Sequence, residues 1–310
     1  MIETLQKGFV LRRTKGFVYL MAADGSKVEC KIKGSLFQKS QYNNRLAVGD
    51  YVLYKPEASG KIGLVYEIVK RNSFLSRARI GIEAEQVIAA NVDYLLITQS
   101  ASSPKPRANF IFRMLAAAEI GNVTPVIVLT KMDLAELAEI EEFLVPFRKL
   151  GVQIILTSSE RPGDEKPIED LLHNHISVLS GPSGVGKSSL INRIYPDLNL
   201  KVGEIIQKTR KGAHTTTNSS VHEVTKGTFI IDTPGIRELG LWGVTQQTLY
   251  QYFPGLSQYA GTCKHKDCRH LSEPKCSAKE ALAAGEIHPA VYAAYKSILE
   301  SLHLKELSSN

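Results

Sequence analysis

The sequence predicts a multidomain protein with an N-terminal all-β barrel, a central α/β domain and a C-terminal, mainly α-helical region. Three observations predict this architecture. Short apolar runs separated by turn residues fill positions 1–70, and apolar strands alternate with amphipathic helices over 71–240. Helical spacing and three clustered cysteines follow over 241–310. A chain of 310 residues has room for two domains of average size and a third small one.

The composition is ordinary for a folded protein, with 43% apolar and 22% charged residues. It excludes a disordered chain, a collagen and a disulfide-dense miniprotein. No apolar run approaches the roughly 18 residues of a membrane span, and residues 1–13 lack the apolar core and cleavage site of a signal peptide. We expect a monomer that works in the cytosol without membrane contact.

The net charge of +7 is concentrated in one part of the chain. Residues 1–70 carry 12 Lys and Arg against 6 Asp and Glu, residues 71–240 carry 19 of each, and residues 241–310 carry 7 against 6. The excess in the first quarter favours a polyanion-binding module there. A solvated lysine-rich surface is the alternative explanation.

The barrel prediction comes from five short runs of strand-forming residues at Gly8–Leu11, Phe17–Met21, Val28–Ile32, Asp50–Tyr54 and Gly63–Ile68. This spacing is typical of an OB-like barrel, a fold that binds oligonucleotides. Rings that can stack on bases alternate with cations that can neutralise phosphates. The rings are Phe9, Phe17, Tyr19, Phe37, Tyr42, Tyr51, Tyr54 and Tyr66, and the cations are Arg12, Arg13, Lys15, Lys31, Lys33, Lys39 and Arg45. Some of the rings would instead fill the barrel core.

Residues 71–79 are polar and basic, and we interpret them as a linker. The central region then predicts strands at Val92–Thr98, Pro125–Thr130, Val152–Leu156, Ile176–Ser180 and Thr228–Asp232. Helices are predicted between them at Asn109–Ile120, Leu134–Leu150, Ile168–His173 and Lys187–Ile194. This alternation predicts a mainly parallel sheet with helices on both faces.

A phosphate-binding loop is the strongest motif of the chain. It comprises Gly181, Pro182, Ser183, Gly184, Val185, Gly186, Lys187 and Ser188, with Ser189 following. It lies between a predicted strand and a predicted helix, the context in which backbone N–H groups and a helix N-terminus surround phosphate oxygens. Lys187 would neutralise the β- and γ-phosphates and assist catalysis, and Ser188 would bind Mg²⁺.

A guanine-recognition motif precedes this loop and comprises Thr130, Lys131, Met132 and Asp133. A carboxylate at Asp133 can accept hydrogen bonds from the N1–H and 2-amino groups of guanine, whereas adenine has a lone pair at N1. Lys131 would lay its aliphatic stem along the purine face. A backbone N–H within Thr157, Ser158 and Ser159 would reach the 6-oxo group.

A third motif begins where the last predicted strand ends. Asp232 would hold Mg²⁺ through water, and the N–H of Gly235 would meet the γ-phosphate, so the segment that follows would respond to the nucleotide. In the polar loop before this strand, Thr216 is our candidate to complete the Mg²⁺ shell. Ile236 stands where many GTPases place a glutamine. We therefore assign water activation to His214, with an ordinary loop histidine as the alternative.

The cysteine cluster predicts a metal site in the C-terminal region. Cys263, Cys268, His270 and Cys276 form a Cys₃His set suited to tetrahedral Zn²⁺, with His265 as a rival ligand. Four committed ligands leave no open position, so the zinc would be structural. After His288-Pro289, an apolar stripe predicts a helix that packs on the rest of the protein.

Together these residues resemble the ribosome small subunit-dependent GTPase A family of bacteria over essentially the whole chain. The resemblance rests on the barrel, the permuted order of guanine motif, phosphate loop and Asp232–Gly235, and the Cys₃His set. It implies a circularly permuted P-loop GTPase in late maturation of the small ribosomal subunit, stimulated by that subunit and bound to its rRNA. Residues 212–217 match the switch region of the family. Thr130 departs from the pattern, since many members carry Asn.

The leading hypothesis is therefore a GTPase with an OB-like RNA-binding barrel (1–70), a circularly permuted GTPase domain (71–240) and a helical zinc-binding domain (241–310). GTP would order the switches and reposition the zinc domain through the residues after Gly235, and hydrolysis to GDP would release the protein from the subunit. Two alternatives remain. One is a nucleic-acid-binding module that uses GTP as a static ligand, and the other is a P-loop ATPase or kinase.

Overall fold

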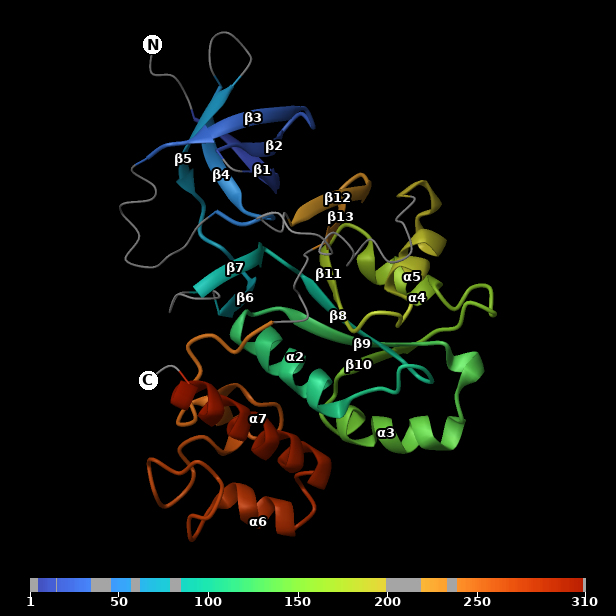
Figure 1. Cartoon of the computed structure of the whole chain (residues 1–310), viewed down its shortest axis with the longest axis vertical. Coiled ribbons are helices and arrows are strands. Elements are labelled where there is room, and N and C mark those ends of the chain that lie inside the picture. The colour runs from blue at the N-terminus through green and yellow to red at the C-terminus, as the bar shows by residue number, and fades with distance from the viewer. Residues whose placement is uncertain are drawn as a thin grey trace.

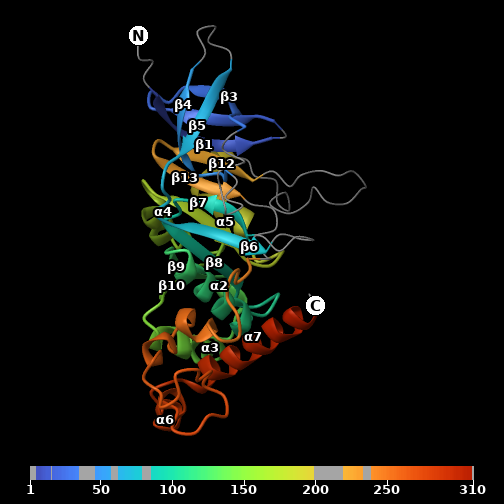
Figure 2. The same ribbon diagram turned by 90° about the vertical axis from the view of Figure 1, so that its left-hand side faces the viewer.

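The computed structural model describes residues 5–14, 16–34, 46–56, 62–78, 85–198, 219–232 and 239–308. Figure 1 shows an elongated molecule with a β barrel at one end, a sheet flanked by helices in the middle and a helical region at the other end. The side view in Figure 2 shows the same order along the long axis. Within the described ranges, no helix is long and apolar enough to cross a membrane.

Five strands close the N-terminal barrel: β1 (Gln6–Arg13), β2 (Val18–Ala22), β3 (Lys27–Ile32), β4 (Tyr51–Lys55) and β5 (Gly63–Ile68). They pair in the order β1-β2-β3-β5-β4, and β4 returns to β1. All pairs are antiparallel except β3 with β5. Apolar side chains that alternate along these strands fill the interior, among them Val10, Leu20, Val52 and Val65. The OB-like barrel predicted from the sequence is confirmed.

The central region alternates strands and helices as predicted. Its sheet strands are β8 (Tyr94–Ser100), β9 (Thr124–Thr130), β10 (Gln153–Leu156), β11 (Ile176–Ser180), β12 (Ser220–Thr225) and β13 (Thr228–Asp232). Its helices are α2 (Ala108–Ile120), η1 (Met132–Leu134), α3 (Leu137–Lys149), α4 (Lys166–Leu172), α5 (Lys187–Ile194) and η2 (Pro196–Leu198).

The sheet has helices on both faces. Its strands run in the order β10-β9-β8-β11-β13-β12, and the first five are parallel. Side chains alternate between the faces, so Leu96 and Leu179 pack with α4 and α5, while Leu95 and Val178 pack with α2 and α3. The predicted α/β architecture is confirmed, and β12 is an antiparallel addition that the sequence analysis missed.

The barrel and the central region share one continuous sheet. The last part of β1 leaves β4 and pairs with β12, where Arg12 lies opposite Ser220. The result is an eleven-stranded sheet that runs from β10 through β12 and β1 into the barrel. Phe9 packs against Phe229 across this junction, with ring centroids 5.0 Å apart.

The prediction of a linker at 71–79 is wrong for its described part. Residues Phe74–Ala78 form β6, which pairs with β7 (Glu85–Ala90) in a separate two-stranded sheet. The side chains of Leu75 and Ser76 are buried despite the arginines around them. Strands β6 and β7 pair only with each other in this sheet, and their register shifts between Leu75 and Ser76. The alternation of apolar and polar residues along them is therefore short and irregular.

The C-terminal region contains η4 (Leu249–Tyr252), η5 (Ser257–Tyr259), α6 (Ser277–Ala283) and α7 (Pro289–Ser308). Helix α7 begins at the predicted proline and lies against α2, where Asn109 and Arg113 donate hydrogen bonds to Ser297 and Ser301. The predicted apolar stripe faces inward and includes Val291, Tyr295 and Ile298. One hydrophobic core joins this region to α2 and α3, so no boundary separates their interiors.

Candidate nucleotide and metal sites

The nucleotide motifs gather at one edge of the central sheet. Strands β8, β9, β10, β11 and β13 are parallel, so their carboxyl ends meet at the same edge. The chain passes from β8 to β9 and β10 on one side and returns through β11 to β13 on the other. Ligands of open α/β sheets bind where the strand order reverses in this way. Here that point lies between β8 and β11.

The phosphate loop has the backbone that its glycines allow. Gly184 and Gly186 have φ values of 78° and 91°, in the left-handed region. A Cβ on Gly181 would lie 2.1 Å from the carbonyl oxygen of Thr98, so only glycine fits against β8. Pro182 is half-buried, Ser183 is exposed and Val185 is buried. The loop therefore lies directly on the end of the neighbouring strand.

Lys187 begins α5 and turns back across the loop. Its ammonium group donates hydrogen bonds to the carbonyl oxygens of Gly181 and Pro182, at 2.8 and 2.7 Å, and the residue is 5% exposed. Ser188 is buried beside it, whereas Ser189 is exposed. A cation held inside a ring of backbone groups is suited to bind phosphate oxygens in place of the carbonyls.

The guanine motif touches the phosphate loop directly. The hydroxyl of Thr130, at the end of β9, donates a hydrogen bond to the carbonyl oxygen of Val185 at 2.5 Å. Lys131 adopts a left-handed conformation with φ 59°, and its ammonium contacts the carbonyl oxygens of Ser103 and Gly184 at 2.6 and 2.7 Å. The side chain of Met132 is buried. The structure therefore brings together the two motifs that lie about 50 residues apart.

Asp133 is exposed at this edge, and Ser158 donates a very short hydrogen bond to its carboxylate. Three neighbouring backbone N–H groups are engaged inside the protein. Thr157 donates to Leu129, Ser158 donates to the carboxylate of Asp164, and Glu160 donates to the Ser158 hydroxyl. The N–H of Ser159 makes no hydrogen bond with the residues that the structure describes. Of the predicted trio, Ser159 therefore has the N–H that a base can use.

The residues predicted to hold Mg²⁺ are described only in part. The backbone of Asp232 ends β13, one strand away from the phosphate loop on β11. Its side chain, together with His214, Thr216 and Gly235, lies outside the described residues. The carbonyl of Ser103, which accepts a hydrogen bond from Lys131, was not predicted from the sequence. Since Ser103 takes part only through its backbone carbonyl, no side-chain pattern indicates it.

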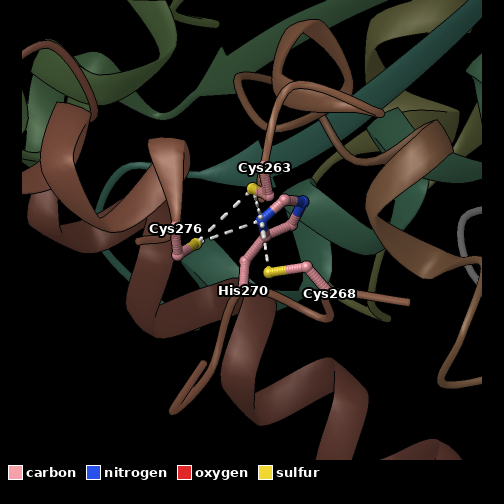
Figure 3. Close-up of side chains that lie close together, drawn as sticks. All are labelled: Cys263, Cys268, His270 and Cys276. Carbon is pink, nitrogen blue, oxygen red and sulfur yellow. Dashed lines mark hydrogen bonds between the residues drawn. The ribbon is translucent and has the colours of Figure 1, made fainter. Parts of the chain in front are cut away.

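The four predicted metal ligands form one cluster (Figure 3). Their ligand atoms all lie within 4.8 Å of one another. The Nδ1 atom of His270 is 3.5, 3.7 and 3.3 Å from the sulfurs of Cys263, Cys268 and Cys276. Thiolates 2.3 Å from a tetrahedral zinc ion would be separated by about 3.8 Å, and the sulfurs of Cys263 and Cys276 are 3.9 Å apart. The exposed His265 is outside this cluster.

Three of the four side chains in the cluster are buried, so a thiolate there needs a compensating positive charge. Burial raises the pKa of Cys268 to about 12 and lowers the pKa of His270. A cation would compensate for burying the thiolate form. The backbone of the cluster is held by α7, since the hydroxyls of Tyr292 and Tyr295 donate to the carbonyl oxygens of His270 and Arg269 at 2.6 and 2.7 Å.

The barrel carries cations over aromatic rings on its outer surface. Arg12 lies over Tyr19, Lys31 over Phe17, Lys33 over Tyr66 and Lys7 over Tyr51, with 4.2–5.9 Å between cation and ring centroid. Phe9 and Tyr54 are buried and belong to the core, as expected for some of the rings. Lys15, Phe37, Lys39, Tyr42 and Arg45 lie outside the described residues.

Comparison with known proteins gives one family. The family model described as RsgA GTPase matches residues 68–242. Two relatives named small ribosomal subunit biogenesis GTPase RsgA come from Chlorobaculum parvum and Haemophilus influenzae. The first is 36% identical and covers 97% of this chain and 99% of its own length. The second is 34% identical and covers 97% and 86%.

Two solved structures share the fold over nearly the whole length. The crystal structure of YloQ, described as a circularly permuted GTPase, is 28% identical with a TM-score of 0.73 and covers 97% of this chain and 96% of its own. The structure of YjeQ from Thermotoga maritima is 27% identical with a TM-score of 0.76 and covers 96% and 98%. The permuted motif order of this chain agrees with that description.

Proposed function

Because the chain belongs to the RsgA GTPase family, we propose that it hydrolyses GTP to GDP and phosphate in the biogenesis of the small ribosomal subunit. One observation carries the nucleotide part of this proposal. The hydroxyl of Thr130 bonds the phosphate loop at Val185, so the base motif and the phosphate motif form a single site at the sheet edge.

Base recognition rests on two groups in this proposal. The exposed carboxylate of Asp133 accepts hydrogen bonds from the N1–H and 2-amino groups of guanine, while the N–H of Ser159 donates to the 6-oxo group. Adenine offers an acceptor at N1 and a donor at position 6, so both contacts would be lost with ATP. The stem of Lys131 covers the purine face.

Phosphate binding and hydrolysis use the other half of the site. Lys187 and the loop N–H groups hold the β- and γ-phosphates, and Ser188, Thr216 and Asp232 hold Mg²⁺, which would neutralise charge that develops on the phosphates. His214 orients or deprotonates the attacking water. The sequence supports this role, since Ile236 cannot replace a glutamine.

We propose zinc as the ion of the Cys₃His cluster. Three sulfurs and one imidazole nitrogen within 4.8 Å of one another match the donors that zinc prefers. Because these four ligands fill a tetrahedral shell, the ion would be structural. Cys263, Cys268, His270 and Cys276 would then hold the loops on which α7 packs.

The proposed function also includes binding to the small ribosomal subunit through its rRNA. Four cation–aromatic pairs on the barrel surface and the excess of basic residues over 1–70 support it, since such pairs stack bases and neutralise phosphates. We propose that the protein acts in the cytoplasm, where ribosomes are assembled, and that it works as a monomer.

The deciding experiment measures phosphate release from GTP and from ATP, with and without purified small subunits, for the wild type and His214→Ala. We expect hydrolysis of GTP alone, faster with subunits, and a strong loss of rate in the variant. Pelleting with subunits should depend on whether GTP, GDP or a non-hydrolysable analogue is bound. Equal pelleting in all three states, with no multiple turnover, would instead support a static GTP ligand. Hydrolysis of ATP would support an ATPase or kinase.

A further inference from the structure

Arg193 connects the phosphate half of the nucleotide site to the base half. It lies in the last turn of α5, the helix that begins at Lys187. Its guanidinium donates one hydrogen bond to the carbonyl oxygen of Ser158 at 2.8 Å and another to that of Arg161 at 2.7 Å. The same group lies 3.1 Å from the carboxylate of Glu165, and the side chain is 24% exposed.

The contact with Ser158 sets the orientation of one particular peptide unit. The carbonyl of Ser158 and the N–H of Ser159 belong to the same peptide group, which is planar, and in a trans peptide they point in opposite directions. Arg193 approaches the carbonyl side, so the N–H of Ser159 is directed away from Arg193. That N–H forms no hydrogen bond within the described part of the chain.

The rest of Ser158 is fixed as well. Its own N–H donates to Asp164 at 3.1 Å, its hydroxyl bonds the carboxylate of Asp133, and the residue is 1% exposed. Arg193 therefore anchors the residue that links both base-reading groups. A cation on the carbonyl also polarises the peptide, which strengthens its N–H as a donor.

We propose that Arg193 is a positioning residue for guanine specificity, which orients and polarises the Ser158–Ser159 peptide so that the N–H of Ser159 reads the 6-oxo group. This inference rests on the proposed GTPase function. A guanidinium is suited to the task because its planar fork reaches the carbonyls of Ser158 and Arg161 together, whereas a lysine ammonium is a single point of charge.

The test compares equilibrium binding of GTP, 6-thio-GTP and ATP to the wild type, Arg193→Met and Arg193→Lys. Sulfur is a weaker acceptor than oxygen, so the wild type should bind 6-thio-GTP about three- to tenfold more weakly than GTP. In Arg193→Met, GTP should bind about three- to tenfold more weakly, and the penalty for sulfur should shrink toward none. Arg193→Lys should lie between, and kcat at saturating GTP should stay near that of the wild type.

Arg148→Met is the matched control, since Arg148 pairs with Glu141 on the exposed surface of α3. It should keep the wild-type ratio of GTP to 6-thio-GTP binding. An undiminished sulfur penalty in Arg193→Met and Arg193→Lys would overturn the inference, even if both bind GTP more weakly, because a merely structural role weakens both nucleotides equally. A wild type without preference for GTP over ATP would instead overturn the proposed function.

Discussion

At the scale of single residues, Thr130 shows how one hydroxyl joins two motifs. The family resemblance leads one to expect Asn at this position. The threonine hydroxyl contacts the carbonyl oxygen of Val185 and, at 3.3 Å, that of Gln99. A hydroxyl has one proton, and the shorter contact uses it for the phosphate loop. The residue therefore aligns the two halves of the site rather than adding a donor for the base.

Replacing Thr130 with Val keeps the shape of the side chain and removes this tether. We expect GTP affinity to fall about three- to tenfold, because the carbonyl of Val185 loses a partner in a buried place. Thr130→Ser keeps the hydroxyl and should bind GTP nearly as the wild type does. Titration calorimetry with GTP measures both. Equal affinity in wild type and Thr130→Val would contradict the role of the tether.

His222 gives a pH-dependent prediction. It lies on β12, where its Nε2 is 3.0 Å from the Ser220 hydroxyl, and burial lowers its pKa below the ordinary 6.5. The unfolded chain then binds more protons than the folded one below that pH, so this group destabilises the fold as pH falls through 6.5.

Thermal unfolding of the wild type and His222→Asn at pH 7.5 and 5.5 checks the sign. The wild type should lose more Tm over this interval than the variant, which has no imidazole to protonate. The opposite order, or parallel losses, would show that His222 does not titrate this way.

At the scale of elements, the sequence predicted those strands and helices whose apolar pattern is regular. Ile176–Ser180, Lys187–Ile194 and Thr228–Asp232 were predicted with the bounds that the structure has. The strands β6, β7 and β12 were missed, because each pairs antiparallel with a local partner and mixes charged with apolar residues. Leu75 is buried although Arg71 and Arg77 flank it, which a composition-based reading cannot distinguish from a linker.

The same contrast holds within the site. The residue types and spacing of the phosphate loop and the guanine motif indicate what each motif binds. The sequence was therefore sufficient to predict both motifs at the ends of strands. Arg193 donates to the backbone carbonyl of Ser158, and Ser103 accepts from Lys131 through its own carbonyl. A contact to a carbonyl leaves no complementary side chain in the sequence.

The cysteine loops give a prediction for metal removal. Residues 241–276 contain only η4 and η5 as helical elements, so the cluster is needed to hold these loops. We expect one zinc per chain by elemental analysis, and a lower Tm after chelation or in Cys276→Ser. Cys30→Ser changes a buried barrel cysteine outside the cluster and should retain the metal. Full zinc content in Cys276→Ser would contradict the assigned ligand set.

At the scale of the whole molecule, the parts are joined more tightly than three separate domains would be. One sheet connects the barrel to the central region, and one core connects the central region to α7. Repositioning of the C-terminal region by GTP, as the sequence suggested, would have to break that core. We therefore expect the response to GTP to be centred on the switch residues.

A buried ion pair offers a test of this integration. Asp50, in the barrel, is fully buried and accepts two hydrogen bonds from Arg71 at 2.7 and 2.8 Å and one from the Ala47 N–H. Asp50→Ala leaves a mostly buried guanidinium without this carboxylate, so we expect a loss of about 3 kcal/mol in the free energy of unfolding.

Denaturant unfolding should show this loss in one transition of the whole chain, because one sheet joins the barrel to the central region and one core joins that region to α7. Glu141→Ala breaks an exposed pair with Arg148 and should cost less than about 1 kcal/mol. Separate transitions, with only one affected by Asp50→Ala, would show that the barrel unfolds independently.

The pairing of β1 with β12 also sets an order of events during translation. Arg12 finds its partner Ser220 only 208 positions later in the chain. At about 5–20 residues per second, a ribosome needs roughly 10–40 s to synthesise that interval. All five barrel strands emerge long before β12, so this end of β1 can pair with β2 at once, but its other edge must wait for β12. Completion of the long sheet is therefore a late step, which follows synthesis of the phosphate loop.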